Sequence, residues 1–197
     1  MLVTNKAIDF KVDAVMANNS IKSVSIKDLI GKNGLILFFW PKDFTFVCPT
    51  EIIAFNNRLK EFQNRGYNLA GVSCDSEMVH LAWKNTEVAN GGIGKIDFPI
   101  LADIKKEIAT AYDVLFDDAI TLRATFIIDK DKNIRHATIN DLPLGRNVNE
   151  TLRLCDAINF VNEHGEVCPA NWKKGQDAMK PTSKGVADYL KKNAKNI

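Results

Sequence analysis

The 197-residue sequence has little net charge and no long apolar run. Its formal net charge of +2 gives no electrostatic reason to expect a nucleic acid or a membrane surface as a partner. No apolar run approaches the roughly 20 residues that span a membrane. Residues 1–10 also lack a basic segment followed by a continuous apolar core, so we expect no signal peptide and a cytoplasmic location.

Cysteine is scarce, and its few positions are widely spaced. The four cysteines are Cys48, Cys74, Cys155 and Cys168. A chain of this length with 46% hydrophobic residues can build a full core, so it does not need a disulfide framework. There is no Cys-x-x-Cys motif and the three histidines lie far apart, so we predict no metal site. In a reducing compartment, a pair of cysteines is then more often catalytic than structural.

The apolar pattern predicts alternating strands and helices. Residues 34–40 form an unbroken apolar run, which is typical of a strand buried on both faces. The remaining predicted elements are a hairpin within 8–26 at the sheet edge, a helix through about 62, a strand over 68–74, a helix over 76–84, a loop over 87–99, a helix over 102–112, antiparallel strands over 123–129 and 134–140, and a helix over 147–163. This order indicates an α/β protein with a thioredoxin-like fold.

The C-terminal residues have a different composition. Residues 165–197 hold seven lysines and resemble an arm, in which Val186, Tyr189 and Leu190 could anchor a short helix. We therefore predict a thioredoxin-like domain with an N-terminal β-hairpin extension over 1–164, followed by a C-terminal arm over 165–197.

One cysteine lies where the first buried strand gives way to a helix. Apolar residues recur at helical spacing from Ile52 onward, and Pro49 suits the first helical position, so Cys48 is expected at or beside the N-cap. A helix N-terminus carries partial positive charge, which favours a thiolate over a thiol. The alternative is a small buried hydrophobe at a helix start. We favour a nucleophile because of the residues around it.

A fast cysteine enzyme needs further groups that stabilise its transition state. Thr45, three residues before Cys48, offers a hydroxyl, and Pro41 can exclude water from the pocket. Arg123, at the start of a predicted strand, offers a fixed positive charge, although it could also be an ordinary surface residue. Cys74 and Cys155 lie on apolar patterns, so we expect them to fill the core.

These residues make a recognisable signature. Pro41, Thr45 and Cys48 with a distant Arg123 resemble the active-site motif of the peroxiredoxins. Cys168, within 164–172, is similar to the resolving cysteine of the typical two-cysteine subfamily, which contains the peroxidase subunit of alkyl hydroperoxide reductase. The resemblance covers roughly residues 4–190, including 91–94 and 141–146.

The resemblance implies a thiol peroxidase that serves antioxidant defence and redox homeostasis. Cys48 would attack hydrogen peroxide or an alkyl hydroperoxide and become a sulfenic acid, with Glu51 and Arg146 in support. Cys168 of a partner subunit would then form an intersubunit disulfide with Cys48. Thioredoxin or a flavoprotein disulfide reductase would reset the pair. The resemblance further implies no metal or organic cofactor, and homodimers assembled into a ring of five dimers.

Sensitivity to overoxidation depends, by the same resemblance, on two elements that control local unfolding. Sensitive members pair a glycine loop with a C-terminal Tyr-Phe that clamps the active-site helix. Here the loop holds Gly91, Gly92 and Gly94, but the tail has Tyr189 followed by Leu190. We therefore expect intermediate sensitivity.

Two other functional classes would use these residues differently. A general disulfide oxidoreductase of thioredoxin type would carry Cys-x-x-Cys, whereas Cys48 is solitary. A chaperone or a redox-signalling binding protein is the other alternative, and a chaperone that only holds unfolded clients would act equally well without Cys48. Residues 129–133 begin like a calcium loop but lack its glycine, and 91–94 are too irregular for a phosphate loop.

Overall fold

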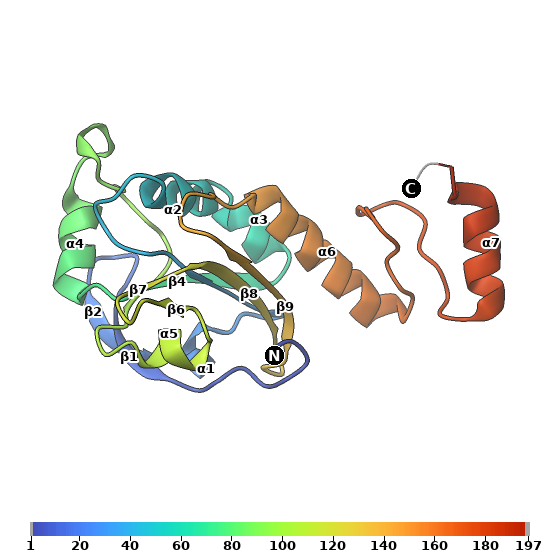
Figure 1. Ribbon diagram of the computed structural model, residues 1–197, viewed down its shortest axis with the longest axis horizontal. Helices are drawn as coiled ribbons and strands as arrows, with labels where there is room; N and C mark the ends of the chain where they lie inside the picture. Colours follow the sequence, from blue (N-terminus) through green and yellow to red (C-terminus); the bar gives the residue numbers. More distant parts are fainter. Residues whose placement is uncertain (1, 196–197) are drawn as a thin grey trace. The chain divides into compact units, whose positions relative to one another are not determined.

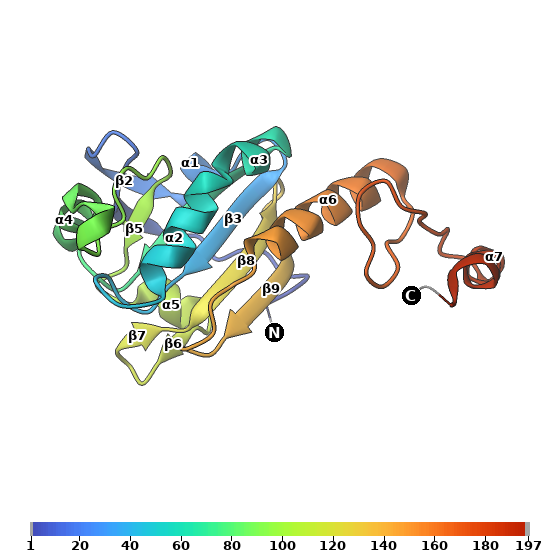
Figure 2. The ribbon, with the colours of Figure 1, turned by 90° about the horizontal axis from the view of Figure 1, so that it is seen from above.

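The computed structural model describes residues 2–195 and divides into two compact units, one ending at Val148 and one beginning at Asn149 (Figure 1). The first unit contains a seven-stranded sheet, with helices α2 and α3 on one face and α1 and α5 on the other (Figures 1 and 2). This arrangement confirms the predicted thioredoxin-like α/β fold. The predicted domain boundary at 164 stays a prediction.

The sheet has parallel strands at its centre and antiparallel strands toward its edges. Strands β3, β4 and β5 run parallel, and β8 joins β3 in the antiparallel direction. The sheet order is β2 (Ile21–Ser25), β1 (Lys11–Val15), β5 (Ile100–Ala102), β4 (Tyr67–Ser73), β3 (Gly34–Phe39), β8 (Arg123–Asp129) and β9 (Ile134–Asn140). A separate small hairpin pairs β6 (Leu115–Phe116) with β7 (Ile120–Thr121).

The helices are of very different lengths. In chain order they are α1 (Ile26–Leu29), α2 (Cys48–Asn57), α3 (Leu59–Asn64), α4 (Glu77–Asn85), the short 3-10 helix η1 (Val88–Asn90), α5 (Glu107–Ala111), α6 (Val148–His164) and α7 (Ser183–Asn193). Among the described residues, no helix is both long and apolar enough to traverse a bilayer.

Most predicted elements are confirmed. Every residue of β3 is buried, as expected for a strand covered on both faces. The β1–β2 hairpin lies at one edge of the sheet, and β8 and β9 form the predicted antiparallel pair. The helix expected over 147–163 is α6.

Two predicted helices differ from the structure. The helix through 62 is interrupted at Arg58, whose backbone (φ −106°, ψ 7°) separates α2 from α3. The helix expected over 102–112 begins later because Ile100–Ala102 pairs with β4 and β1 as strand β5. The buried Asp103 carboxylate accepts hydrogen bonds from the backbone N–H groups of Ile108 and Ala109, which fixes the start of α5 beyond that strand.

The second unit contains α6, an irregular segment and α7. Val167 and Met179 pair as a short antiparallel bridge within the segment. Trp172 is buried, and its ring packs against Phe160 of α6 at 5.0 Å between centroids. The short helix predicted around Val186, Tyr189 and Leu190 is α7.

Candidate active site

Cys48 is the first residue of α2 and is fully buried. Val47 is the N-cap, so the prediction that Cys48 lies at or beside the cap is confirmed, while Pro49 occupies the second helical position rather than the first. The loop Pro41–Val47 joins β3 to this helix. Pro41 is buried, in keeping with its expected role in excluding water.

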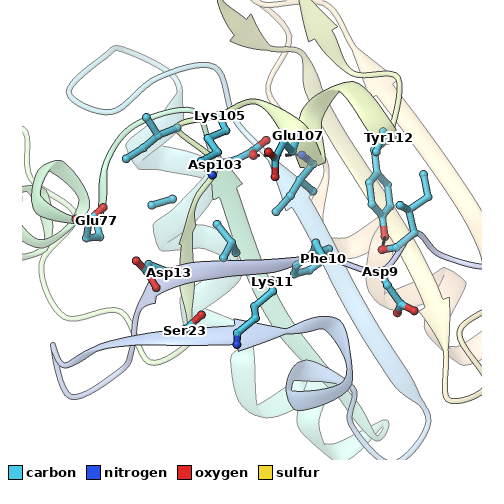
Figure 3. A pocket seen from close by; sticks show the side chains of 16 residues that line it. Asp9, Phe10, Lys11, Asp13, Ser23, Glu77, Asp103, Lys105, Glu107 and Tyr112 are labelled. Atoms are coloured by element: carbon cyan, nitrogen blue, oxygen red, sulfur yellow. Dashed lines mark hydrogen bonds between the residues drawn. The ribbon is translucent and has the colours of Figure 1, made fainter.

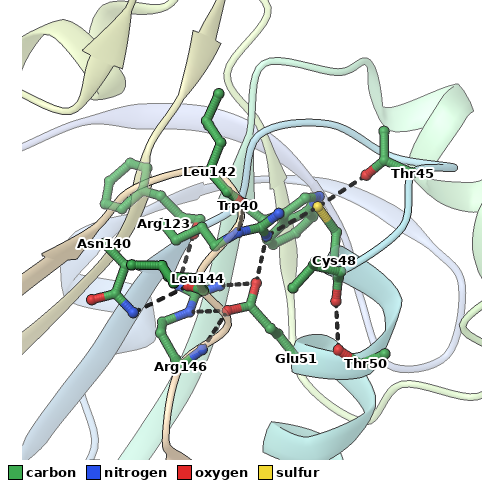
Figure 4. Close-up of polar contacts among 12 residues, drawn as sticks. Trp40, Thr45, Cys48, Thr50, Glu51, Arg123, Asn140, Leu142, Leu144 and Arg146 are labelled. Atoms are coloured by element: carbon green, nitrogen blue, oxygen red, sulfur yellow. Dashed lines mark hydrogen bonds and ion pairs between the residues drawn. The ribbon is translucent and has the colours of Figure 1, made fainter.

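Two side chains donate hydrogen bonds to the Cys48 sulfur (Figure 4). Thr45 Oγ1 lies 3.0 Å from Sγ, and Arg123 Nη1 lies 3.3 Å from it. One donor comes from the loop before α2 and the other from the start of β8, 75 residues away in sequence. Such donors favour negative charge on the sulfur and on an oxygen atom bound beside it.

The Thr45 hydroxyl has a choice of acceptors. Its oxygen lies 2.7 Å from the carbonyl oxygen of Lys42 as well as 3.0 Å from Sγ. A hydroxyl carries one proton, so it donates to one acceptor at a time while its lone pairs remain available. Thr45 can therefore exchange its hydrogen bond between the loop backbone and the sulfur without moving far.

Arg123 is buried, so the alternative of an ordinary surface charge is wrong. Its side chain is 5% exposed, and Nη1 lies 2.7 Å from Glu51 Oε2. Its Nε donates to the carbonyl oxygen of Leu142 at 2.6 Å. These two acceptors orient the guanidinium plane so that Nη1 also reaches Cys48.

Arg146 completes the charge network around Glu51. Its Nε and Nη2 contact the two Glu51 carboxylate oxygens at 2.8 and 2.9 Å. Its Nη1 donates to the carbonyl oxygens of Phe39 and Ala124. Burial lowers the pKa of Arg146, and the charge of Glu51 opposes that shift. Two guanidinium groups against one carboxylate leave net positive charge beside the sulfur, where water is scarce and charge acts strongly.

Cys168 has very different surroundings. It is half-buried in the second unit, and its Sγ lies 3.8 Å from the carbonyl oxygen of Ala157. Burial raises the pKa of the Cys168 thiol, with the nearby Arg153 charge opposing the rise. Cys168 is therefore a thiol at neutral pH in this arrangement.

The remaining two cysteines fit a packing role. Cys155 is buried on α6, and Cys74 packs beside the core at the end of β4. Burial, followed by the charge of Asp103, raises the pKa of Cys74 to about 11. Such a thiol is inert at neutral pH.

The glycine loop of the first unit requires its glycines. Gly91 and Gly94 have φ angles of 83° and 62°, in the left-handed region. A Cβ on Gly92 would lie 2.0 Å from the carbonyl oxygen of Thr86. Asn56 of α2 binds the chain just after the loop: its Nδ2 donates to the carbonyl oxygen of Lys95, and its Oδ1 accepts from the N–H of Asp97. Tyr189 and Leu190 lie on α7 in the other unit, and their joint action with this loop stays a prediction.

A buried polar pair beside the active-site loop, Asp43 and His80, has no signal in the sequence. The two residues are 37 positions apart, and no local pattern links them.

A separate cavity of about 410 Å³ lies between β1 and α5 and shares no residue with the Cys48 site (Figure 3). Within residues 2–195, no three His, Cys, Asp or Glu side chains are grouped to hold a metal ion.

Comparison with known proteins agrees with this geometry. Residues 3–137 match the AhpC/TSA family, and residues 157–192 match the C-terminal domain of 1-Cys peroxiredoxin. The chain belongs to the AhpC/TSA family of peroxiredoxins. It is 60% identical to alkyl hydroperoxide reductase C of Helicobacter pylori over 195 residues, 98% of either chain. It is 50% identical to thioredoxin peroxidase of Trypanosoma brucei rhodesiense over 189 residues, covering 95% of this chain and 94% of that protein.

Solved structures give the same result. The reduced 2-Cys peroxiredoxin of Plasmodium vivax superposes with a TM-score of 0.95 at 48% identity, covering 97% of this chain and 99% of that one. AhpC of Enterococcus faecalis superposes with a TM-score of 0.78 at 38% identity, covering 85% and 99%. This peroxiredoxin is therefore a thiol peroxidase, and its buried, doubly hydrogen-bonded cysteine suits that chemistry.

Proposed function

We propose that Cys48 is the peroxidatic cysteine and that it reduces hydrogen peroxide and alkyl hydroperoxides to water and alcohols. The Cys48 thiolate attacks the terminal peroxide oxygen, an S–O bond forms and the O–O bond breaks. The electron pair leaves on the other oxygen, which takes a proton to become water or an alcohol. Sulfur is thereby oxidised by two electrons to a sulfenic acid. The observation that carries this assignment is the convergence of Thr45 and Arg123 on the Cys48 sulfur.

The surrounding residues have separate roles in this proposal. Arg123 holds the attacked oxygen close to the sulfur and stabilises charge that spreads along the breaking bond. The Thr45 hydroxyl donates a hydrogen bond to the peroxide or accepts one from it. Glu51 and Arg146 keep Arg123 in place, and Pro41 keeps water out.

Cys168 is proposed to resolve the sulfenic acid. Its thiolate would attack Cys48 of a partner subunit, releasing the hydroxyl group as water and leaving an intersubunit disulfide. The names of relatives, which include 2-Cys peroxiredoxins, support a second reacting cysteine. Thioredoxin is the first candidate for the reductant, since one relative is named thioredoxin peroxidase, and a flavoprotein disulfide reductase is the second.

An open sheet edge and several exposed apolar side chains support assembly of identical subunits. Strand β9 is an edge of the sheet, and Ile139 on it is exposed, so a second copy could pair along this edge and cover it. Phe44, Met78 and Ile104 are large apolar side chains that are more than half exposed elsewhere on the first unit. Burial of the β9 edge and of these apolar side chains would suit a homodimer assembled into a ring of five dimers. We also place the enzyme in the cytoplasm, with intermediate sensitivity to overoxidation.

Steady-state turnover tests the assignment. With thioredoxin, thioredoxin reductase and NADPH, the wild type and the control Cys74→Ser should both consume hydrogen peroxide and an alkyl hydroperoxide. Cys48→Ser should consume neither, because a serine hydroxyl is a weak nucleophile at neutral pH. Cys168→Ser should complete about one turnover per subunit and stop. Turnover by Cys48→Ser would contradict the assignment, whereas a chaperone that only holds unfolded clients would act equally well in that variant.

A further inference from the structure

A buried carboxylate and a buried imidazole lie beside the active-site loop without a role in the chemistry above. Asp43 Oδ2 lies 2.6 Å from His80 Nδ1, and both side chains are 0% exposed. Asp43 Oδ1 accepts a hydrogen bond from Trp40 Nε1 at 2.8 Å. The backbone N–H of Asp43 donates to Asp75 Oδ2 at 2.9 Å. One loop residue is thus joined to the end of β3, to α4 and to the turn between β4 and α4.

The hydrogen-bond directions show where the protons lie. His80 Nε2 is 3.2 Å from the carbonyl oxygen of Leu101, which can only accept, so Nε2 carries a proton. A second proton lies between Nδ1 and Asp43 Oδ2, since two bare acceptors at 2.6 Å would repel each other. Burial raises the pKa of Asp43, and the hydrogen bond from His80 opposes the rise. Wherever the shared proton is assigned, the pair is neutral overall, which suits a site closed to water.

The loop that follows Asp43 is strained. Phe44 has a φ angle of 53°, a left-handed conformation that is unfavourable for a bulky residue. Such a conformation persists only where its surroundings impose it. Its ring approaches Trp83 at 5.7 Å but is half exposed, so its side chain gives limited support. The hydrogen bonds of Asp43 therefore hold the backbone immediately before Phe44 and stabilise its strained conformation.

We propose that His80 is a positioning residue of this peroxidase. By holding Asp43, it fixes the loop Pro41–Val47 in its strained form, which places the Thr45 hydroxyl against the Cys48 sulfur. The inference rests on the proposed roles of Thr45 and Cys48. Without the Asp43–His80 hydrogen bond, the Phe44 backbone could leave its left-handed conformation and move Thr45 away from the peroxide. The Cys48 sulfur and Arg123 would keep their positions on α2 and β8.

Two reactions of Cys48 separate positioning from general structure. Peroxide reduction needs Thr45 in place to hold the peroxide, whereas alkylation by iodoacetamide needs only the Cys48 thiolate, which Arg123 still stabilises when Thr45 moves. In reduced His80→Gln, the second-order rate constant with hydrogen peroxide should fall at least about tenfold, and that for alkylation of the Cys48 peptide, followed by mass spectrometry, should change less than about threefold. The exposed His164→Gln is the matched control and should change neither rate.

A conservative variant should preserve the hydrogen bonds of the residue 43 side chain. In Asp43→Asn, the amide oxygen can accept from Trp40 Nε1, the amide nitrogen can donate to His80 Nδ1, and His80 Nε2 can still donate to Leu101, so all three hydrogen bonds can form. Its peroxide rate should stay within about threefold of wild type. Trp40→Phe removes one donor to Asp43 and should slow peroxide reduction more than alkylation. This variant replaces His80→Gln in the test if His80→Gln shows no cooperative melting transition.

Three results would overturn the proposal. The first is equal slowing of peroxide reduction and alkylation in His80→Gln or, if that variant does not fold, in Trp40→Phe. The second is no slowing of either reaction, and the third is an Asp43→Asn protein that reacts with peroxide as slowly as His80→Gln. Failure of the proposed function would be recognised separately, because wild-type Cys48 would then remain unoxidised by peroxide.

Discussion

The two cysteines assigned to the reaction lie in contrasting environments. Cys48 is fully buried at a helix start, with two side chains donating to its sulfur and a network of charges behind them. Cys168 is half-buried in an irregular segment, beside a single backbone carbonyl at 3.8 Å and with a raised pKa. In the proposed function, the first site is preorganised for an incoming peroxide, and the second cysteine remains a thiol until it meets the sulfenic acid. If the proposed roles are right, the rate of peroxide reduction is set at the Cys48 site, and Cys168 depends on being brought to the oxidised Cys48.

The largest effect should come from removing the fixed charge at the Cys48 site. Arg123→Met takes away one donor to the sulfur and one of the two arginines that pair with Glu51. The rate constant of Cys48 with hydrogen peroxide should fall by about 10²–10³-fold, as when one preorganised donor is lost from an active site. Stopped-flow fluorescence or competition measures this rate.

Arg58→Met is the matched control for that substitution. It removes an arginine whose pair with Glu61 is about 40% exposed, so the rate should change less than about twofold. A fall of less than tenfold in Arg123→Met would mean that the Cys48 site does not owe its rate to this charge.

A smaller effect is expected from the hydroxyl. Thr45→Val keeps the shape of the side chain but removes its hydrogen bonds, and the peroxide rate should fall about 10- to 100-fold, or about 1.4–2.7 kcal/mol. Thr45→Ser should restore most of the rate. Thr110→Val, which loses an exposed hydroxyl bonded to the carbonyl of Lys106, should leave the rate unchanged. Equal rates for Thr45→Val and Thr110→Val would remove Thr45 from the mechanism.

The contrast also predicts how pH acts on the second step. Because the pKa of Cys168 is raised, its thiolate is the minor form at neutral pH. As long as the pH stays below that pKa, raising the pH by one unit increases the thiolate fraction about tenfold. The rate of disulfide formation after a peroxide pulse should therefore rise from pH 6 to pH 8. Quenched-flow sampling on non-reducing gels measures this rate. A rate that is flat over this range would show that the observed environment of Cys168 is not the one from which it reacts.

The smallest effect is expected at Cys74. A pKa of about 11 leaves about one thiolate in a thousand at pH 8. Cys74 should stay unlabelled by iodoacetamide while Cys48 is labelled, and Cys74→Ala should keep its peroxide rate within about twofold of wild type. Rapid labelling of Cys74 in the folded protein would contradict its packing role.

The sequence predicted those features that local chemistry determines. The run Gly34–Phe39 is apolar throughout because both faces of β3 are buried. The placement of Cys48 beside the N-cap followed from Pro49 and the helical spacing after it. These signals lie within a few residues of each other, so they can be read without the fold.

Features set by tertiary contacts could not be predicted in the same way. Strand β5 has only three residues and exists because β4 and β1 flank it. The burial of Arg123 follows from its pairing with Glu51, 72 residues away in sequence. The contact between Asp43 and His80 likewise arises from packing of α4 against the loop, and neither residue carries a local sign of its partner.

The most direct test of the two-cysteine account is a single oxidation. One equivalent of hydrogen peroxide is added to the reduced wild type and to Cys168→Ser, followed by non-reducing gels and intact mass. We expect a disulfide-linked dimer from the wild type, joined through Cys48 and Cys168, and a sulfenic acid at Cys48 in the variant. An internal disulfide within one subunit would contradict the partner-subunit route, and an unoxidised Cys48 would contradict the peroxidatic assignment itself.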